Sequence, residues 1–175
     1  MCGRYQTADD AQREIRPGDR AVIITAKGEK QLYWGVKAPD NRLIINARSE
    51  TAHIKPMFRN AMLRGRCIVK ASAFFEWDAK KHCHAFASPN GETLYMAALF
   101  MLTDDGSERF VILTQPAKNG AEKVHPRMPC LLQSSEYRHL WLHDDDMAAH
   151  LLSENVQLVI ERKHTDAEQL NFFIS

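Results

Sequence analysis

The chain has 175 residues, of which 45% are hydrophobic and 26% are charged. This composition is typical of a globular protein, and the length predicts a single domain over residues 1–175. The 23 basic and 22 acidic residues leave a net charge of +1. That charge argues against a protein that coats long duplex DNA through a polybasic face, but it is compatible with a small groove carrying a few arginines.

The sequence shows no sign of a membrane segment or a secretory signal. No apolar run approaches the ~20 residues that a membrane-spanning helix needs. Residues 1–5, Met-Cys-Gly-Arg-Tyr, lack the apolar core of a signal peptide. We therefore expect a cytoplasmic protein that does not associate with membranes.

Short apolar segments separated by turn residues predict strands in the first two thirds of the chain. A hairpin is indicated by two such segments on either side of the turn at Lys27-Gly28-Glu29. Buried strands are indicated further along by runs of aliphatic and aromatic residues. The predicted strands are Ala21–Thr25, Gln31–Trp34, Leu43–Asn46, Cys67–Val69, Ala73–Trp77, Leu94–Leu102 and Arg109–Thr114.

Three segments have features of helices, and one more strand is predicted near the end. Pro56 is suited to open a helix that Gly65 ends. Helical spacing also covers Ser135–Leu142 and Asp144–Leu152, before a last apolar strand at Val156–Ile160. Together these elements predict an α+β domain with a mostly antiparallel β core and a few packed helices.

Cys2 has a chemical property that no internal cysteine shares. Removal of Met1 would leave a free α-amine and a thiol on adjacent carbons, and such a 1,2-aminothiol condenses with an aldehyde to an imine and then to a thiazolidine ring. The α-amine titrates near 7.7–8.0, so part of it is nucleophilic at neutral pH. The alternative is that Cys2 is merely the second residue. Cys67 and Cys130 lie in apolar runs and are expected in the core.

Two further residues are candidates for proton transfer. Glu76 lies between aromatic residues on a predicted strand, where burial without a partner is costly, so it is either a general acid/base or a member of a salt bridge. His125 begins the run His125-Pro126-Arg127-Met128-Pro129, whose two prolines predict a stiff, extended loop. His125 and Arg127 suit proton transfer beside a phosphate, and the alternative is an ordinary surface loop.

The run Asn46-Ala47-Arg48-Ser49-Glu50-Thr51 leaves a strand and enters a helix-like segment. Its Asn, Arg and Glu side chains can hold one another or a ligand in place, and the guanidinium of Arg48 can bind a phosphate with two N–H groups. The alternative is that these residues only cap a helix and form a surface ion pair. His82 and His84 share a strand face. No metal site is expected from them, because the recurring four-ligand spacing of a zinc site is absent.

In this order, these pieces resemble the SRAP family, the SOS-response-associated peptidase-like proteins that process abasic sites in single-stranded DNA. The resemblance spans residues 2 to about 132. It rests on Cys2-Gly3-Arg4-Tyr5, Trp34-Gly35, Asn46–Thr51, Met57-Phe58-Arg59, Arg66–Val69, Phe75-Glu76-Trp77, Arg109–Thr114 and His125–Pro129.

The resemblance implies a self-consuming reaction in the DNA damage (SOS) response, in which the N-terminal cysteine links covalently to an abasic site. Cys2 would be the nucleophile, Asn46 would orient it, and Glu76 and His125 would be the acid/base groups. The resemblance further implies a monomer without cofactor, Met1 removed by methionine aminopeptidase or by self-processing, and possible lyase and autopeptidase activities. Location would be cytoplasmic, at the nucleoid during action on DNA. The phosphates flanking the lesion would be held by Arg4, Arg48, Arg59 and Arg127.

Two other functions stay open at this point. Cys2, His125 and Asn46 also resemble the Cys-His-Asn set of a cysteine peptidase. The chain is alternatively a non-covalent single-strand binder. It departs from the family pattern in a short segment after Trp34-Gly35, which in the family is often aromatic-rich and able to stack on bases, and in its tail from Asp166 to Ser175.

Overall fold

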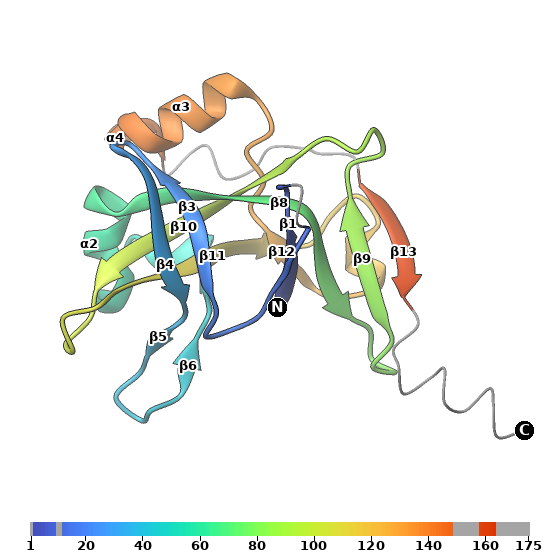
Figure 1. The fold of residues 1–175 in the computed structure, drawn as a ribbon, viewed down its shortest axis with the longest axis horizontal. Coiled ribbons are helices and arrows are strands. Elements are labelled where there is room, and N and C mark those ends of the chain that lie inside the picture. Colours follow the sequence, from blue (N-terminus) through green and yellow to red (C-terminus); the bar gives the residue numbers. More distant parts are fainter. Residues whose placement is uncertain (1, 10–11, 149–157, 164–175) are drawn as a thin grey trace, which may run out of the picture.

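Strands dominate the computed structural model, which describes residues 2–9, 12–148 and 158–163 (Figure 1). The strands are β1 (Arg4–Thr7), β2 (Glu14–Ile15), β3 (Arg20–Thr25), β4 (Gly28–Trp34), β5 (Val36–Lys37), β6 (Leu43–Ile44), β7 (Asn46–Arg48), β8 (Arg66–Trp77), β9 (Cys83–Ala87), β10 (Leu94–Leu102), β11 (Glu108–Pro116), β12 (Arg127–Pro129) and β13 (Val159–Lys163). The helices are α1 (Ser49–Ala52), α2 (Pro56–Arg64), the 3-10 turn η1 (Ala121–Lys123), α3 (Ser135–His143) and α4 (Asp145–Ala148).

Five strands close into a barrel. Its order is β8-β10-β11-β4-β3, and β3 pairs with β8 to complete the ring. The pairings of β11 with β4 and with β7 are parallel, whereas the other pairs are antiparallel. The long strand β8 reaches past the barrel, where it pairs with β1 and β9, and β9 pairs in turn with β13.

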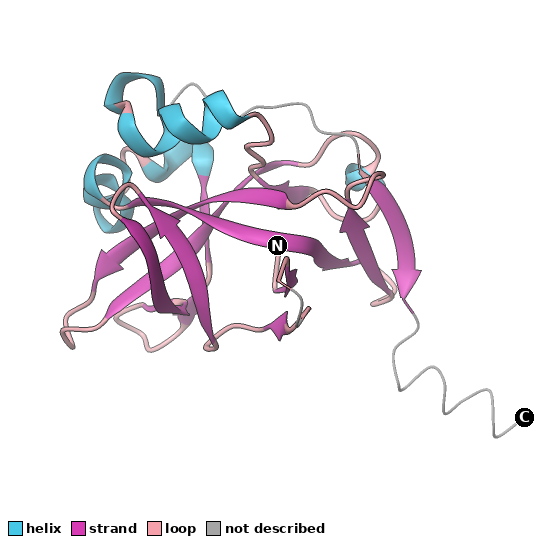
Figure 2. Ribbon diagram, turned by 45° about the horizontal axis from the view of Figure 1, so that its top comes forward, coloured by secondary structure: helices cyan, strands magenta, loops and turns pink. Residues whose placement is uncertain are grey.

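The protein has two apolar cores, one on each side of the barrel wall. The first lies inside the barrel and contains the aromatic residues Tyr5, Trp34, Phe74, Phe86 and Phe110. The second lies between the barrel and the helices, which gather on one side of the sheet in Figure 2. Trp141 of α3 is fully buried there, and its indole N–H donates to the carbonyl of Cys67 at 2.9 Å. The burial of Cys67 and Cys130 confirms that both are core residues.

Most predicted elements are confirmed with small shifts of their ends, and β10 and the start of α2 match without any shift. Two differences are informative. The segments Cys67–Val69 and Ala73–Trp77 form one continuous strand, because β8 is covered along its length by β3, β10, β1 and β9. The segment Leu43–Asn46 is divided at Ile45, whose carbonyl accepts hydrogen bonds from the Trp34 indole and the Ile112 amide.

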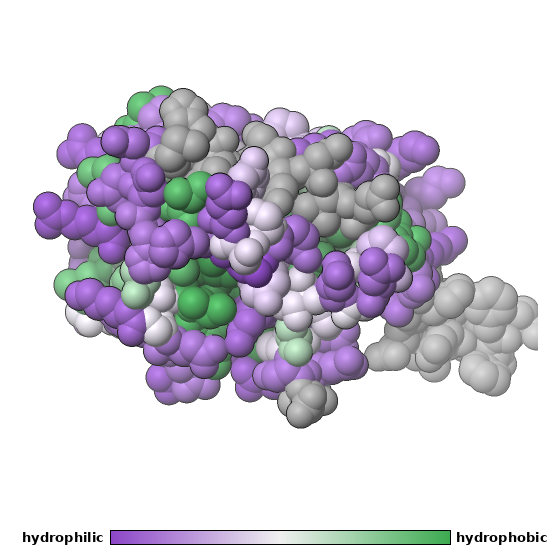
Figure 3. All heavy atoms as spheres, turned by 90° about the horizontal axis from the view of Figure 1, so that it is seen from above, coloured by the Kyte–Doolittle hydropathy of each residue, from purple (hydrophilic) through white to green (hydrophobic). Residues whose placement is uncertain are grey.

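Part of the predicted C-terminal structure lies outside the described residues. The predicted helix over Asp144–Leu152 is seen as α4 up to Ala148. The predicted last strand is seen as β13, and residues 156–157 and the tail from Asp166 are not described. None of the helices among the described residues is long and apolar enough to cross a membrane. The face shown in Figure 3 is mostly hydrophilic, with small separate hydrophobic patches.

Candidate active site at the N-terminal cysteine

The fold brings together the four residues that the sequence predicts as catalytic. Cys2 lies two residues before β1, which runs antiparallel to β8 with Arg4 opposite Phe75. This register places Cys2 at the end of β8 that carries Glu76. Asn46 opens β7 and His125 precedes β12, and both of these strands pair with β11.

Asn46 holds the backbone of Cys2. The Asn46 side-chain Nδ2 donates to the Cys2 carbonyl at 2.8 Å. The Asn46 Oδ1 is buried and has no hydrogen-bond partner within the described part of the chain. Because a buried acceptor without a partner costs free energy, this oxygen is suited to receive a donor from a bound molecule.

The Cys2 thiol is enclosed. The residue is fully buried, and its Sγ lies 3.6 Å from the Arg4 carbonyl, to which it can donate. Burial raises the pKa of this thiol far above its usual range, with the Glu76 carboxylate acting in the same direction. The thiol is therefore protonated at neutral pH in this environment.

Glu76 and His125 form a pair whose pKa values move in opposite directions. The Glu76 side chain is 3% exposed, and burial raises its pKa to about 7. The His125 Nδ1 lies 3.9 Å from Glu76 Oε2, and burial lowers the pKa of this histidine below 6.5. Near pH 7 the acid therefore keeps much of its proton while the imidazole is largely neutral, which suits acid/base chemistry.

Arg4 lies on the outer face of the same strand pair. Its guanidinium lies 5.0 Å from the Trp77 ring and 5.9 Å from the Phe75 ring. It also lies 3.4 Å from a Glu14 carboxylate oxygen. Cross-strand neighbours on one face of a sheet are close enough for such contacts, so the β1–β8 register fixes the position of Arg4.

The other three predicted DNA-binding arginines differ in their surroundings. Arg48 at the end of β7 and Arg59 on α2 are exposed. Arg127 is instead held by Glu50, with Nη1 to Oε1 at 2.5 Å and Nη2 to Oε2 at 2.8 Å. Hydrogen bonds from Arg127 lower the pKa of Glu50 to about 2.

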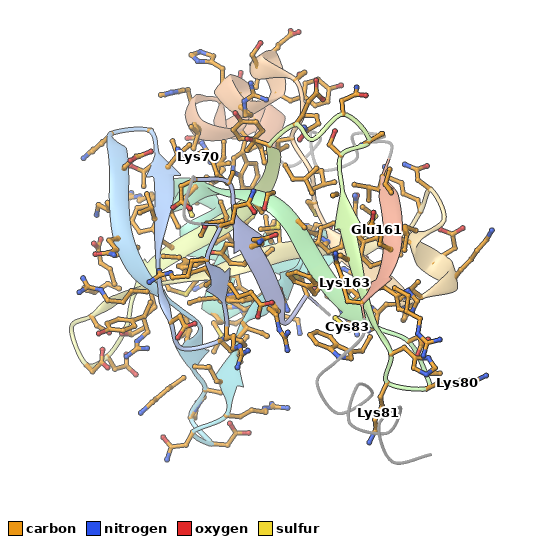
Figure 4. All side chains as sticks on the ribbon, turned by 45° about the vertical axis from the view of Figure 1, so that its right-hand side comes forward. Lys70, Lys80, Lys81, Cys83, Glu161 and Lys163 are labelled. Atoms are coloured by element: carbon orange, nitrogen blue, oxygen red, sulfur yellow. The ribbon has the colours of Figure 1, made fainter. Side chains whose placement is uncertain are left out.

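Some residues near the site are not among those predicted from the sequence. Thr114 is fully buried, and its carbonyl accepts from Arg127 Nη2 at 2.5 Å. No local pattern marks it, because this contact joins two strands. A second group consists of lysines: Figure 4 shows Lys80 and Lys81 projecting from the turn after β8, and Lys163 on β13, opposite Cys83 of β9. The adjacent pair Lys80-Lys81 was a visible signal in the sequence.

The two histidines at the β8–β9 turn have a local explanation. His82 Nδ1 and His84 Nε2 lie 3.0 and 3.1 Å from the same Asp78 oxygen. Within the described residues no group of three or more His, Cys, Asp or Glu side chains is arranged to hold a metal ion.

In this barrel-forming fold, Asn46 holds Cys2 beside the buried Glu76 and the partly exposed His125. The family model described as SOS response associated peptidase (SRAP) matches residues 1–169. The chain belongs to this family. Similar sequences include the abasic site processing protein YedK of Escherichia coli, 30% identical over 181 residues, covering 83% of this chain and 81% of YedK. The abasic site processing protein YoaM of Bacillus subtilis is 29% identical over 206 residues, covering 97% and 86%.

Solved structures show the same fold. A protein from Bacteroides thetaiotaomicron has a TM-score of 0.77 at 25% identity, covering 90% of this chain and 80% of its own. A protein from Bordetella bronchiseptica has a TM-score of 0.78 at 22% identity, covering 94% and 100%. The solved structures confirm the strand-rich fold, and the family match confirms the resemblance seen in the sequence.

Proposed function

We propose that this protein processes abasic sites in single-stranded DNA during DNA damage and joins itself covalently to the lesion through Cys2. Family membership and the names of its curated relatives support this proposal. The observation that carries it is the position of Cys2, the residue that follows a removable Met1. Its carbonyl is held by Asn46, and it lies at the end of β8 that bears Glu76.

The chemistry needs only groups that the chain and the lesion supply. Once Met1 is removed, the α-amine of Cys2 attacks the aldehyde carbon of the ring-opened sugar, and water leaves to give an imine. The thiol sulfur then adds to the imine carbon while the thiol proton passes to the nitrogen, which closes a thiazolidine. The same imine is the species from which β-elimination cuts a DNA strand, so a lyase activity belongs to the same proposal.

Glu76 and His125 are proposed to move the protons of these steps. An abasic sugar is mostly a closed hemiacetal, and opening it needs a proton delivered to the ring oxygen and another removed from the hydroxyl. A buried carboxyl with a pKa of about 7 can deliver a proton at neutral pH. The neutral imidazole of His125, 3.9 Å away, can accept one.

The remaining polar groups are proposed to position the DNA. The unpartnered Asn46 Oδ1 is suited to accept a hydrogen bond from the amine or a sugar hydroxyl. Exposed Arg48 and Arg59, together with Arg4, are proposed to hold phosphates that flank the lesion. Arg127 can also contact a phosphate, although both terminal nitrogens of its guanidinium already donate to Glu50 and Nη2 also donates to Thr114.

The surroundings of Cys2 favour this reaction over a cysteine peptidase mechanism. A peptidase nucleophile reacts as a thiolate and has a lowered pKa, whereas burial raises the pKa of the Cys2 thiol. An imine forms through the amine, and the thiol enters only in the second step. A non-covalent single-strand binder differs from the proposed protein because its complex with abasic DNA would not survive denaturing electrophoresis.

Inserting one alanine between Met1 and Cys2 tests the need for a terminal aminothiol. The inserted variant keeps a cysteine thiol but lacks an adjacent free amine, so it should form no stable adduct with abasic DNA. Intact mass spectrometry of the parent protein should show loss of Met1 and, after reaction, one protein per lesion. Adduct formation by the inserted variant at the parental rate would refute the thiazolidine mechanism.

A further inference from the structure

We infer that Glu50 is a positioning residue for the reaction at Cys2, because its ion pair with Arg127 ties the segment that carries Asn46 to the segment that carries His125. The inference rests on the proposed function for its kinetic readout. It concerns a residue that would touch neither the DNA nor the reacting atoms.

The tie is made across β11. Glu50 follows β7 in the chain, Arg127 opens β12, and β7 and β12 both pair with β11. Arg127 reaches over β11 to Glu50 with both terminal nitrogens, and Nη2 also donates to the carbonyl of Thr114. A bidentate Arg–carboxylate pair fixes direction as well as distance, so it holds both segments in one geometry.

Hydrogen bonds connect the Glu50–Arg127 pair to two residues of the site, Asn46 and His125. On one side, Thr114 Oγ1 donates to the carbonyl of Ala47 at 3.4 Å, next to Asn46. On the other side, the Arg127 amide lies 3.1 Å from His125 Nδ1 and is placed to donate to it. The His125 ring is therefore oriented by the backbone of the residue that Glu50 holds.

The arginine side of this pair is largely removed from water. The Arg127 side chain is 15% exposed and the Glu50 side chain 44% exposed, and Thr114 beside Arg127 is fully buried. Exposed ion pairs contribute little to stability, whereas a pair that is partly removed from water and supported by further hydrogen bonds is stronger. Since the pKa of Glu50 is lowered to about 2, its charge is present at every pH at which the protein would work.

Glu50→Gln keeps the shape of the side chain and removes its charge, which gives a test that separates positioning from binding. A matched control is Glu108→Gln, because Glu108 also holds a cation, Lys30, with both oxygens at 2.8 Å. Glu108 lies six residues before Thr114 on β11, roughly 20 Å away.

We expect Glu50→Gln to slow covalent adduct formation at saturating abasic DNA by roughly 10–100-fold, the range for a misplaced catalytic group. Its affinity for an intact single strand should stay equal or increase, because the charge of Arg127 is no longer compensated. Glu108→Gln should change neither quantity. A Glu50→Gln rate at saturating DNA within twofold of the parent rate, or an equal loss in Glu108→Gln, would overturn the inference.

A second readout does not depend on the proposed function. If Glu50 holds the Arg127 segment, amide hydrogen exchange at Arg127 should become about tenfold faster or more in Glu50→Gln and remain unchanged in Glu108→Gln. Unchanged exchange in Glu50→Gln would overturn the inference even if the parent protein forms no adduct. Absence of an adduct with the parent protein would instead refute the proposed function.

Discussion

At the scale of single residues, the most unusual group is Glu76. Its side chain is only 3% exposed, and burial raises the pKa of this carboxyl to about 7. The sequence could predict that this glutamate was exceptional, because aromatic residues surround it. It could not predict that His125 would face it, since β8 and the loop before β12 meet only in the folded barrel.

The raised pKa of Glu76 has a consequence for stability. Between pH 4.5, the ordinary value, and pH 7, the folded protein holds a proton on Glu76 that the unfolded chain has lost. Stability contributed by this residue therefore falls as pH rises through that window. The free energy of unfolding of Glu76→Gln minus that of the parent protein should therefore be about 2–3 kcal/mol larger at pH 8 than at pH 5.

Urea unfolding at the two pH values measures this gain. Glu92→Gln, at an exposed position, is the control and should show no such gain. His125 has a lowered pKa and loses stability as pH falls below 6.5, but that contribution is present in both proteins and largely cancels. A Glu76→Gln variant that parallels the parent protein would show that Glu76 is ionised in the folded state at pH 5.

The kinetic prediction concerns the same pair. Glu76→Gln and His125→Ala should each slow adduct formation by roughly 10²–10³-fold, the range typical of lost general acid/base catalysis. The final extent of adduct should stay high, because Cys2 and its amine are intact. A substrate whose aldehyde is already free should rescue the variant that fails to open the sugar ring. Unchanged rates in both variants would mean that the two residues are structural.

At the scale of elements, β8 decides the geometry of the site. Its first half lies in the barrel wall, and its second half carries Glu76 out to β1 and β9. Periodicity predicted the two halves as separate strands, because Lys70 and Ser72 interrupt the apolar pattern. The strand continues through them since backbone pairing on both sides outweighs the two polar side chains.

The junction of α2 and β8 gives a prediction at this scale. A Cβ added to Gly65 would lie 2.0 Å from the Phe100 carbonyl oxygen, and the Phe100 amide donates to the Gly65 carbonyl at 2.7 Å. Gly65→Ala must therefore push backbone away from backbone, and we expect a loss of about 2–4 kcal/mol in free energy of unfolding.

Gly91→Ala is the comparison for that measurement. Gly91 has a φ of +69° with open space around it, so alanine there should cost only about 1–2 kcal/mol of backbone strain. Chemical denaturation of both variants decides the point. Equal losses would mean that the contact between α2 and β10 adjusts to the extra methyl group without strain.

At the scale of the whole molecule, positive and negative charges nearly balance, which argues against a broad basic face. The net charge is +1, and many basic side chains pair with carboxylates, as in Lys30–Glu108 and Lys70–Glu29. Motifs in the sequence predicted the family, because each motif is a short run, and the roles of the site residues stay predictions. The arrangement of those runs around β11 and the engagement of Arg127 by Glu50 depend on long-range pairing, which no single run encodes.

This charge distribution predicts how the protein binds DNA. Arg48→Ala and Arg59→Ala should each weaken binding of an abasic single strand and reduce the salt slope by about 0.7, the counterion release for one phosphate contact. Lys27→Ala, in the turn between β3 and β4, is the control and should leave the slope unchanged. Salt titrations by fluorescence anisotropy measure the slopes, and an unchanged slope for an arginine variant would remove it from the phosphate contacts.

Denaturing electrophoresis with a single-stranded oligonucleotide that carries one abasic site tests the central claim most directly. The Met1-processed protein should give a slower band that survives heat and detergent, with one protein per lesion. Cys2→Ala should give no such stable band, and an oligonucleotide with an intact base should give none with either protein. A stable band from Cys2→Ala equal to that of the parent protein, or no band from the parent protein, would contradict the account.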